Sequence, residues 1–346
     1  MSEREKFHTE ELVVVMSHYD IGFIQAIREF PRGSRRAPKL RITSDKGEYL
    51  LKRRARGKDD PFKVAFSHAL QMHLAGKQFP LPHLIGTRGD NNSMLQHNKA
   101  VYELFEYIRG DAYDNSPEST SDSGKTLALY HKLLREYTPE FEPPVGSYHQ
   151  SNIIDTSINR IPETFDKLEE VDAPEDKVKT TLAFLKDSYD KACASVEKHG
   201  LSGWPSQIVH CDWHPGNMLF RQRKVVAVID YDSARMQQRV IDIANGALQF
   251  SILGGSEDPD DWPAFLDATR FKRFIRGYDD VDVISVPEFQ VLPGLMIEAM
   301  VAESVLPVAT TGSFGRIAGY PFLQMIERKV RWVQQNADAL ILAVAH

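Results

Sequence analysis

Two short apolar segments with a polar loop between them narrow the possible fold more than any other feature of this sequence. The first segment opens the stretch Ile208–Phe220, and the second forms most of Val225–Asp230. Apolar runs of this length predict short buried strands. Pro215-Gly216 makes the loop turn sharply, so we expect Asp212 and Asn217 to converge. The pattern therefore predicts a polar site supported by buried strands rather than an acidic surface loop.

The residue types and their order in this region fit phosphoryl transfer. Asp212 can orient an attacking hydroxyl group and accept its proton. The amide oxygen of Asn217 and the carboxylate of Asp230 can bind the Mg²⁺ that bridges nucleotide phosphates. We therefore interpret Asp212 as the catalytic base, and Asn217 and Asp230 as the metal ligands.

The same segment has two alternative interpretations, a zinc site and a cysteine nucleophile. His210 and His214 have the i,i+4 spacing of a zinc pair on a helix, but Pro215-Gly216 interrupts any helix and no Glu lies between them. Cys211 beside two histidines is a possible nucleophile. Both are weaker than phosphoryl transfer, and His210 is better explained as a structural hydrogen-bonding residue of the loop.

Composition sets broad limits on the class of protein. The chain has 346 residues, and 42 Lys and Arg against 48 Asp and Glu give a formal charge of −6, which argues against a nucleic-acid binder. Only two cysteines occur, which excludes a disulfide scaffold and favours a reducing, cytoplasmic location. No apolar run approaches the about 18 residues of a membrane span. We expect no membrane partner, and the oligomeric state is not determined.

Periodicity predicts two lobes, residues 1–108 and residues 109–346, joined by a hinge near residues 105–110. The first contains a short helix capped by Thr9, one long helix, and strands predicted at Phe23–Ile27, Lys39–Thr43, Glu48–Lys52, Leu84–Thr87 and Ala100–Tyr107. The long helix is Pro61–Gly76. The second lobe is predicted to be mainly helical, with helices at Gly124–Tyr137, Lys177–Cys193, Ile241–Leu253, Phe265–Tyr278, Pro287–Pro307 and Pro321–Ala345. Asp114–Ser123 is expected to be a loop, and Thr138–Ile161 an irregular insertion.

The loop and the following strand resemble the aminoglycoside phosphotransferase and choline kinase superfamily. The resemblance implies an α+β, bilobal, protein-kinase-like fold: a small antiparallel sheet lobe with one helix, and a larger helical lobe. It also implies an ATP- and Mg²⁺-dependent enzyme, with Asp212, Asn217 and Asp230 in the roles given above. Asp242 would brace the catalytic loop. Two segments near the start of the chain, Thr9–Gly22 and Lys46–Lys52, look like the type II homoserine kinase and spore-coat kinase branch.

By the same resemblance, Lys52 contacts the α- and β-phosphates and Ser34 lies in the turn that covers them. The family normally pairs this Lys with a Glu on the next helix, but Pro61–Gly76 contains no Glu, and His68 is nearest to the expected place. The covering turn, Pro31–Pro38, has a single Gly. Its three arginines have two interpretations, phosphate contact or a solvated basic turn.

The backbone of Glu106 and Ile108 is expected to pair with adenine. Side chains expected to line the acceptor pocket are Trp213, Asp232, Arg235, Glu298 and Glu303. The resemblance implies that the acceptor is a small hydroxyl compound, with homoserine or an amino sugar ahead of choline-like alcohols and aminoglycosides. Two glutamates suit a cation and Arg235 suits a carboxylate, so the charge of the acceptor stays open. The alternative function is that of a nucleotide-binding pseudokinase or structural protein of the same fold.

Overall fold

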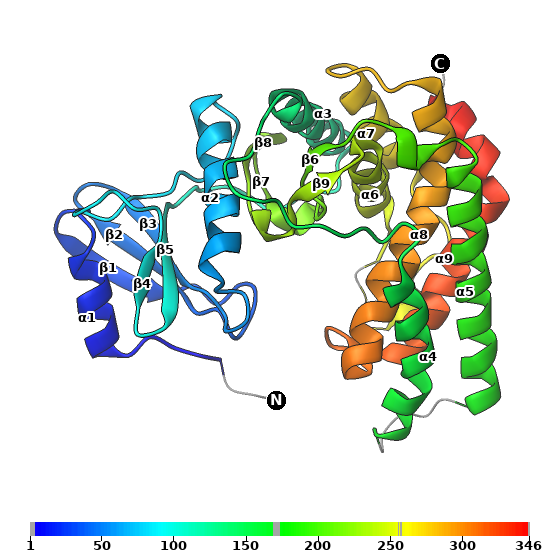
Figure 1. The fold of residues 1–346 in the computed structure, drawn as a ribbon, viewed down its shortest axis with the longest axis horizontal. Coiled ribbons are helices and arrows are strands. Elements are labelled where there is room, and N and C mark those ends of the chain that lie inside the picture. Colours follow the sequence, from blue (N-terminus) through cyan, green and yellow to red (C-terminus); the bar gives the residue numbers. More distant parts are fainter. Residues whose placement is uncertain (1–3, 169–173, 255, 257, 345–346) are drawn as a thin grey trace. The chain divides into compact units, whose positions relative to one another are not determined.

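The computed structural model describes residues 4–168, 174–254, 256 and 258–344, which form an α+β structure with two compact units (Figure 1). The first unit comprises residues 1–113, 136–144 and 216–234, and the second comprises residues 114–135, 145–215 and 235–346. The predicted class, a small antiparallel sheet followed by a mainly helical region, is confirmed. The division predicted at residue 108 stays a prediction.

A five-stranded antiparallel sheet forms the centre of the first unit. Its strands follow the order β1-β2-β3-β5-β4, and they are β1 (Ile24–Glu29), β2 (Lys39–Ser44), β3 (Glu48–Arg53), β4 (Leu95–His97) and β5 (Ala100–Glu106). Alternate residues of β2 are buried, as expected for a sheet with one face on a core. That core contains Ile42, Leu51 and Leu104, together with Val15 of α1 (Thr9–Ser17). Burial of these aliphatic side chains stabilises the sheet.

Two further elements complete the first unit. Helix α2 (Pro61–Gly76) has the predicted bounds, because Asp60 accepts a hydrogen bond from the Phe62 amide and Pro61 occupies the first turn. A hairpin of β7 (Met218–Arg221) and β8 (Lys224–Val228) belongs to the same unit. It follows the short 3₁₀ helix η2 (Pro215–Asn217) and precedes η3 (Tyr231–Ser233).

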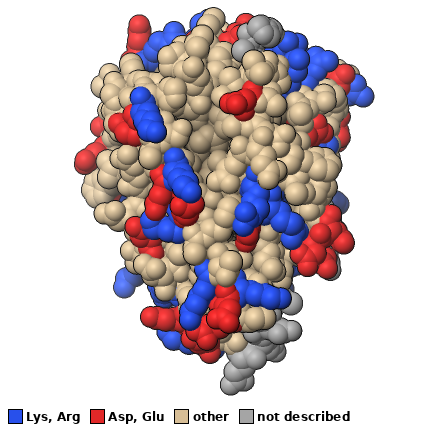
Figure 2. Space-filling view, turned by 90° about the vertical axis from the view of Figure 1, so that its right-hand side faces the viewer, with Lys and Arg blue, Asp and Glu red and all other residues tan. Residues whose placement is uncertain are grey.

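Within the described residues, seven α-helices make up most of the second unit. They are α3 (Pro117–Leu134), α4 (Asn152–Asp166), α5 (Glu175–Glu197), α6 (Arg239–Ser251), α7 (Ala268–Asp279), α8 (Val286–Thr311) and α9 (Gly319–Val344). The short elements are η1 (Leu201–Gly203), η4 (Pro259–Asp261), the pair β6 (Gln207–Val209) and β9 (Arg235–Gln237), and the pair β10 (Ser313–Phe314) and β11 (Ile317–Ala318). Figure 2 shows positive and negative side chains intermingled on one face of the molecule.

Four sequence predictions about elements differ from the structure. Helix α3 begins at Pro117, inside the predicted loop, because Ser116 accepts a hydrogen bond from the Ser119 amide and so caps the helix. Helix α4 lies largely inside the predicted irregular insertion. Leu84 makes only an isolated bridge with Phe105, so the strand predicted there is wrong. Thr9 is the first helical residue rather than the cap. Ala345 lies outside the described residues.

Helix α8 is the most apolar element of the second unit. By length and composition alone it could cross a membrane, which the search of the sequence for apolar runs did not predict. However, 78% of its most apolar window is buried within the structure. It packs against α4, α5, α6 and α9. We therefore interpret α8 as the core helix of the helical unit.

Helices α3 and α7 approach each other closely where two glycines face the opposite backbone. A Cβ atom on Gly277 would lie 2.1 Å from the Ser121 carbonyl oxygen, and one on Gly124 would lie 2.1 Å from the Phe274 carbonyl oxygen. No side chain fits at such distances, so the two glycines allow the helices to touch.

We predict that Gly277→Ala lowers the free energy of unfolding by about 1–3 kcal/mol, because the added methyl group must push two packed helices apart. Urea denaturation measures this change. Gly76→Ala is the matched control, since a Cβ atom there meets nothing within 4 Å. A helical Gly→Ala change without a clash should be neutral or stabilising. Equal effects of the two substitutions would contradict the proposed close contact.

Candidate active site

The loop that precedes Asp212 is held by one buried carboxylate. Asp242 on α6 accepts hydrogen bonds from the amide of His210 (2.6 Å) and from the amide of Cys211 (2.8 Å). His131 on α3 lies 3.2 Å from the same carboxylate and contacts the Tyr278 hydroxyl group at 2.8 Å. Burial would raise the pKa of Asp242, but His131 and His210 outweigh burial and lower it. The carboxylate predicted as a brace therefore contacts the backbone of the loop.

Asp212 itself is partly exposed at the end of this braced segment. The side chain of Asp212 is 39% exposed, and His214 Nε2 lies 3.5 Å from its carboxylate. Cys211, immediately before it, has a φ of +59°, a conformation that costs a non-glycine residue about 1–3 kcal/mol. The two hydrogen bonds to Asp242 offset this strain. The backbone that leads to Asp212 is thus fixed, while the Asp212 side chain remains open to solvent.

Asn217 and Asp230 bracket the β7–β8 hairpin of the first unit. The Ile229 amide donates a hydrogen bond to the Asn217 carbonyl oxygen (2.9 Å), which places the two predicted ligands at the open end of one hairpin. Asp230 has a φ of +66°, which aspartate tolerates better than most residues. An amide oxygen and a carboxylate oxygen are hard donors that suit Mg²⁺. The donor set therefore fits the predicted metal.

Lys52 finds its carboxylate partner on a strand instead of a helix. Its Nζ lies 3.4 Å from Glu103 Oε2 on β5, and the Glu103 side chain is completely buried. Arg54 and His68 each lie 2.7 Å from the other oxygen of Glu103. Burial would raise the pKa of Glu103, but the three neighbouring groups lower it well below its usual range. Sequence reasoning missed Glu103, because cross-strand register is not visible in a single sequence.

The turn predicted to cover phosphates is braced by the N-terminal segment. Arg4 donates to the carbonyl oxygens of Pro31 (2.7 Å) and Ser34 (3.2 Å), and the Ser34 hydroxyl accepts from the Arg36 amide. Directly after the turn, Lys39 lies opposite Lys52 in the β2–β3 register. Burial, and then the charge of Lys52, lower the pKa of Lys39. Lys39 is a second cation beside Lys52 that sequence reasoning missed.

The segment predicted to contact adenine lines a cavity of about 630 Å³ in the first unit. Glu106 and Ile108 both line it, and an ion pair between Glu48 and Arg109 (2.6 Å) forms part of the same wall. The Glu106 amide donates to the His83 carbonyl oxygen. Among the described residues, the Ile108 amide has no hydrogen-bond partner. That amide is therefore available to a ligand, and its contact with adenine stays a prediction.

The structure places the five predicted acceptor residues in different surroundings. Trp213 is completely buried against Tyr130 and His210, in the core of the second unit. In the first unit, both carboxylate oxygens of Asp232 are bound by Arg54, at 2.8 and 3.0 Å. These contacts occupy Trp213 and Asp232, which differs from the expectation that they line a pocket.

The other three predicted acceptor residues lie in the second unit. Arg235 donates to the Gly146 carbonyl oxygen at 3.4 Å. Glu298 is buried and contacts His149. Glu303 accepts hydrogen bonds from Asn245 and Gln249, both at 2.7 Å. Of the predicted set, Glu303 is the residue whose pKa responds to the charge of Asp212.

Burial gives Glu303 an unusual pKa. Loss of solvent, with a smaller contribution from the negative charge of Asp212, raises the pKa of Glu303 to about 7 despite two hydrogen bonds that lower it. A carboxyl group that titrates near neutral pH is a common feature of functional sites. It can offer a negative charge to a cationic ligand above that pH.

A profile of the phosphotransferase enzyme family matches residues 26–284. The chain belongs to this family. The matched region contains Lys52, Asp212, Asn217, Asp230 and Asp242, whereas helices α8 and α9 lie beyond it. The resemblance seen in the sequence is therefore confirmed.

One curated relative of this phosphotransferase is the homoserine kinase of Zymomonas mobilis subsp. mobilis (strain ATCC 31821 / ZM4 / CP4). The two are 26% identical over 232 residues, which are 65% of this chain and 65% of that protein. The chain thus matches about two thirds of the length of this relative. At this level of identity, the relation is distant.

Solved structures share the fold of this phosphotransferase over nearly the whole chain. An aminoglycoside phosphotransferase from Alicyclobacillus acidocaldarius subsp. acidocaldarius DSM 446 covers 100% of this chain and 98% of its own, with a TM-score of 0.68 and 16% identity. A microcompartment-associated aminopropanol kinase covers 97% of this chain and 99% of its own, with a TM-score of 0.69 and 14% identity. Spectinomycin phosphotransferase in complex with ADP and spectinomycin covers 96% of this chain and 100% of its own, with a TM-score of 0.58 and 13% identity. These similarities confirm the fold.

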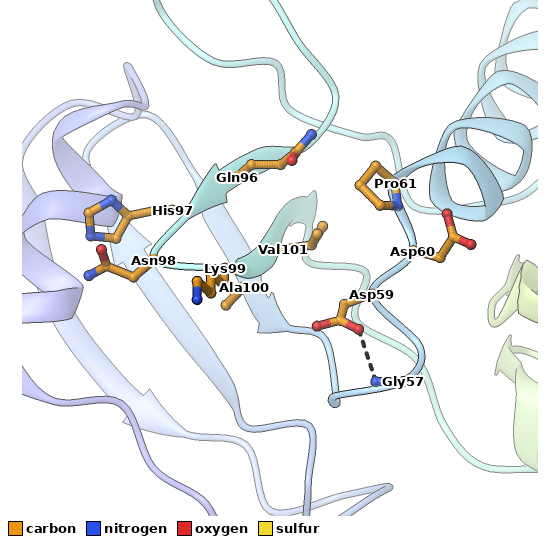
Figure 3. A pocket seen from close by; sticks show the side chains of 10 residues that line it. All are labelled: Gly57, Asp59, Asp60, Pro61, Gln96, His97, Asn98, Lys99, Ala100 and Val101. Carbon is orange, nitrogen blue, oxygen red and sulfur yellow. Dashed lines mark hydrogen bonds between the residues drawn. The ribbon is translucent and has the colours of Figure 1, made fainter.

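A second cavity of the first unit, of about 410 Å³, carries no comparable chemistry. It lies between the start of α2 and the turn that joins β4 to β5 (Figure 3). Its two acidic residues are engaged with nearby backbone: Asp59 accepts from the Gly57 amide (2.9 Å), and Asp60 caps α2.

We predict that Glu103→Gln lowers the free energy of unfolding of this phosphotransferase by about 3 kcal/mol or more, because it removes the counter-charge of Lys52 and one of the two counter-charges of Arg54. Urea denaturation at neutral pH measures the change. Glu106→Gln on the same strand is the control, since its side chain is 49% exposed and the change should stay within about 0.5 kcal/mol. If Glu103→Gln is as mild as the control, the buried cluster does not organise the unit.

The raised pKa of Glu303 predicts a pH dependence of stability. A carboxyl group whose pKa rises from 4.5 to about 7 on folding stabilises the fold fully below pH 4.5, and this contribution is lost as pH rises through 7. Glu303→Gln cannot ionise, so its stability relative to the unchanged protein should increase between pH 5 and pH 8. Urea denaturation at both pH values tests this. A stability difference that is equal at the two pH values would refute it.

Proposed function

We propose that this phosphotransferase is an ATP- and Mg²⁺-dependent kinase that phosphorylates the hydroxyl group of a small amino alcohol. Homoserine and amino sugars are the leading acceptors. The observation that carries the proposal is the loop braced by Asp242, which presents a partly exposed Asp212 inside the region matched by the family. In this proposal, Asp212 orients the acceptor hydroxyl group and takes its proton during in-line transfer.

The nucleotide is proposed to be held by groups of the first unit. Lys52 would contact phosphate oxygens, with Lys39 adding a second positive charge beside it. Asn217 and Asp230 would hold Mg²⁺, which when bound neutralises phosphate charge. The Ile108 amide would donate to the adenine ring. Complexes of relatives with ADP or AMP-PNP support an adenine nucleotide as the cofactor.

An amine on the acceptor is supported by the environment of Glu303. Its carboxylate, when ionised, would complement an ammonium group of the acceptor, and its pKa is influenced by the charge of the proposed base. The relatives include enzymes named for homoserine and aminopropanol, and both compounds are amino alcohols. Arg235 would suit a carboxylate on the same acceptor, which favours homoserine. We further propose a cytoplasmic location, because both cysteines are free thiols.

The alternative is a nucleotide-binding pseudokinase. Two features support it: the missing Glu of α2, since a Lys without a carboxylate partner would be poorly positioned, and the single Gly in the turn predicted to cover the phosphates. Glu103 supplies that carboxylate from β5. This contact favours a working phosphate site, so we rank the enzyme first.

Asp212→Asn tests the proposed reaction. The amide keeps the shape of the side chain but cannot accept the hydroxyl proton, so kcat should fall by about 10²–10⁴ while ATP affinity changes little. Coupled ADP-release assays with homoserine, aminopropanol, choline, an amino sugar and an aminoglycoside measure turnover. Calorimetry with an ATP analogue measures binding.

His214→Gln is the control, because it changes the neighbour of Asp212 and leaves the proposed base intact. Near-normal turnover of Asp212→Asn would refute its role as base. Nucleotide binding without turnover on any acceptor of the panel would favour the pseudokinase.

A further inference from the structure

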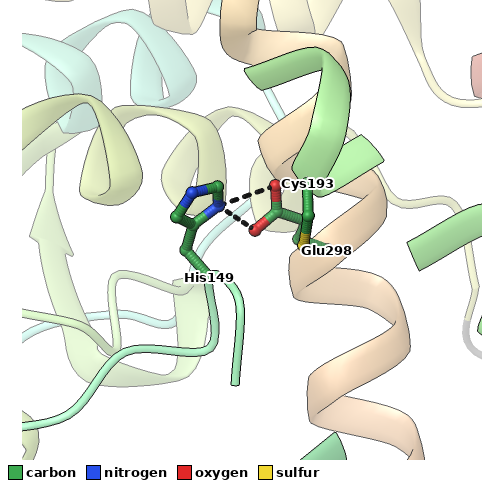
Figure 4. A group of neighbouring side chains, drawn as sticks. All are labelled: His149, Cys193 and Glu298. Atoms are coloured by element: carbon green, nitrogen blue, oxygen red, sulfur yellow. Dashed lines mark hydrogen bonds and ion pairs between the residues drawn. The ribbon is translucent and has the colours of Figure 1, made fainter. Parts of the chain in front are cut away.

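Three side chains with metal-ligating atoms meet inside the second unit, and the proposed kinase reaction uses none of them. They are His149 in the segment before α4, Cys193 on α5 and Glu298 on α8 (Figure 4). Their ligand atoms all lie within 4.8 Å of one another. Each side chain is at least nine-tenths buried. Residues far apart in the sequence thus bring three different donor groups to one point.

We propose that His149, Cys193 and Glu298 form a binding site for a zinc-class divalent metal ion. An imidazole nitrogen, a thiolate and a carboxylate form a mixed donor set that zinc accepts in tetrahedral coordination. Three protein ligands leave a fourth position for water. Hard ions such as Mg²⁺ and Ca²⁺ are disfavoured, because they prefer oxygen donors only.

The distances in the cluster fit such an ion after a small adjustment. His149 Nδ1 lies 2.8 and 3.1 Å from the two carboxylate oxygens of Glu298. Around a tetrahedral ion with bonds of about 2.0 Å, a nitrogen and an oxygen ligand are about 3.3 Å apart. The two side chains therefore need to separate by only a few tenths of an ångström. All three elements could make room without a change in the fold.

The other nitrogen of the same imidazole ring provides an independent observation. His149 Nε2 lies 3.4 Å from a carboxylate oxygen of Glu197, which in turn accepts a hydrogen bond from the Ser202 hydroxyl group (2.9 Å). Metal-ligating histidines commonly donate their second N–H to a carboxylate in this way, which fixes the ring and exposes the other nitrogen to the metal. Glu197 would therefore act as the positioning residue of the site.

The proposed ion would link three parts of the second unit. Tyr148, next to His149, donates to the Ile241 carbonyl oxygen on α6 (3.4 Å), and its own carbonyl oxygen accepts from the Tyr189 hydroxyl group on α5. A metal bound at His149 would hold this segment against α5 and α8. Its role is structural, because the cluster contains no residue of the proposed reaction. Without a metal, the same contacts amount to a buried ion pair between His149 and Glu298.

Zinc and cobalt binding to the full-length, metal-stripped protein tests the proposal. We expect one Zn²⁺ per chain and a rise in the melting temperature on its addition. Co²⁺ at the same site should give tetrahedral d–d bands and a thiolate-to-cobalt charge-transfer band. Cys193→Ser should abolish the charge-transfer band. Cys211→Ser, which changes the only other cysteine of the sequence, should keep it.

Glu197→Gln should keep the cobalt spectrum and weaken zinc binding by about 10–100-fold, because it alters the partner of His149 and no ligand. If Cys193→Ser does not fold, His149→Gln replaces it, and the expected result is loss of stoichiometric Zn²⁺ binding. Absence of stoichiometric Zn²⁺ binding in the unchanged protein would overturn the proposal and leave the ion pair. Loss of the band in Cys211→Ser but not in Cys193→Ser would overturn it as well. None of these readouts depends on kinase activity.

Discussion

The hydrogen bonds from two loop amides to the buried carboxylate of Asp242 are the interaction on which the proposed chemistry depends most. A buried charge is costly unless it is paired and hydrogen-bonded. Asp242 accepts hydrogen bonds from two amides of the loop and is paired with the imidazole of His131. These contacts hold Cys211 in a left-handed conformation that it would otherwise avoid. Because Asp212 follows directly, its position is set by its backbone. The side chain can then stay solvent-accessible, as a base that receives a substrate must.

The first unit also contains a buried carboxylate with several partners, that of Glu103. One completely buried carboxylate is shared by Lys52, Arg54 and His68. Lys52 lies on β3, Arg54 directly follows β3, and His68 lies on α2. The helix thus contributes an imidazole where the family normally has a carboxylate, and the carboxylate comes from β5. A Glu at position 68 would face Glu103, and two buried carboxylates at that distance repel each other. The absence of a helix Glu is therefore explained by the presence of Glu103.

The sequence predicted the parts of this structure that depend on local pattern. Runs of strand-forming residues located β2 and β3, the helical spacing of apolar residues from Pro61 to Gly76 located α2, and the spacing of Asp212 and Asn217 pointed to the reaction class. Sequence-based prediction failed where the same residue types are common in two kinds of local structure. Ser116 and Pro117 are turn formers and also begin helices, so the start of α3 was taken for a loop. Glu103 and Lys39 were missed because each becomes relevant only through cross-strand register.

Helix α8 shows why residue type alone did not assign the acceptor site. Glu298 and Glu303 were grouped together in the sequence as two acids of one predicted helix. Five positions along a helix rotate a side chain by about 140°, so the two face different neighbours. Glu303 meets Asn245 and Gln249 and responds to Asp212, whereas Glu298 meets His149. Each acid in this apolar helix carries a desolvation cost, which a positively charged ligand would offset. For Glu303 that ligand would be the ammonium group of the acceptor, and for Glu298 it would be a metal ion.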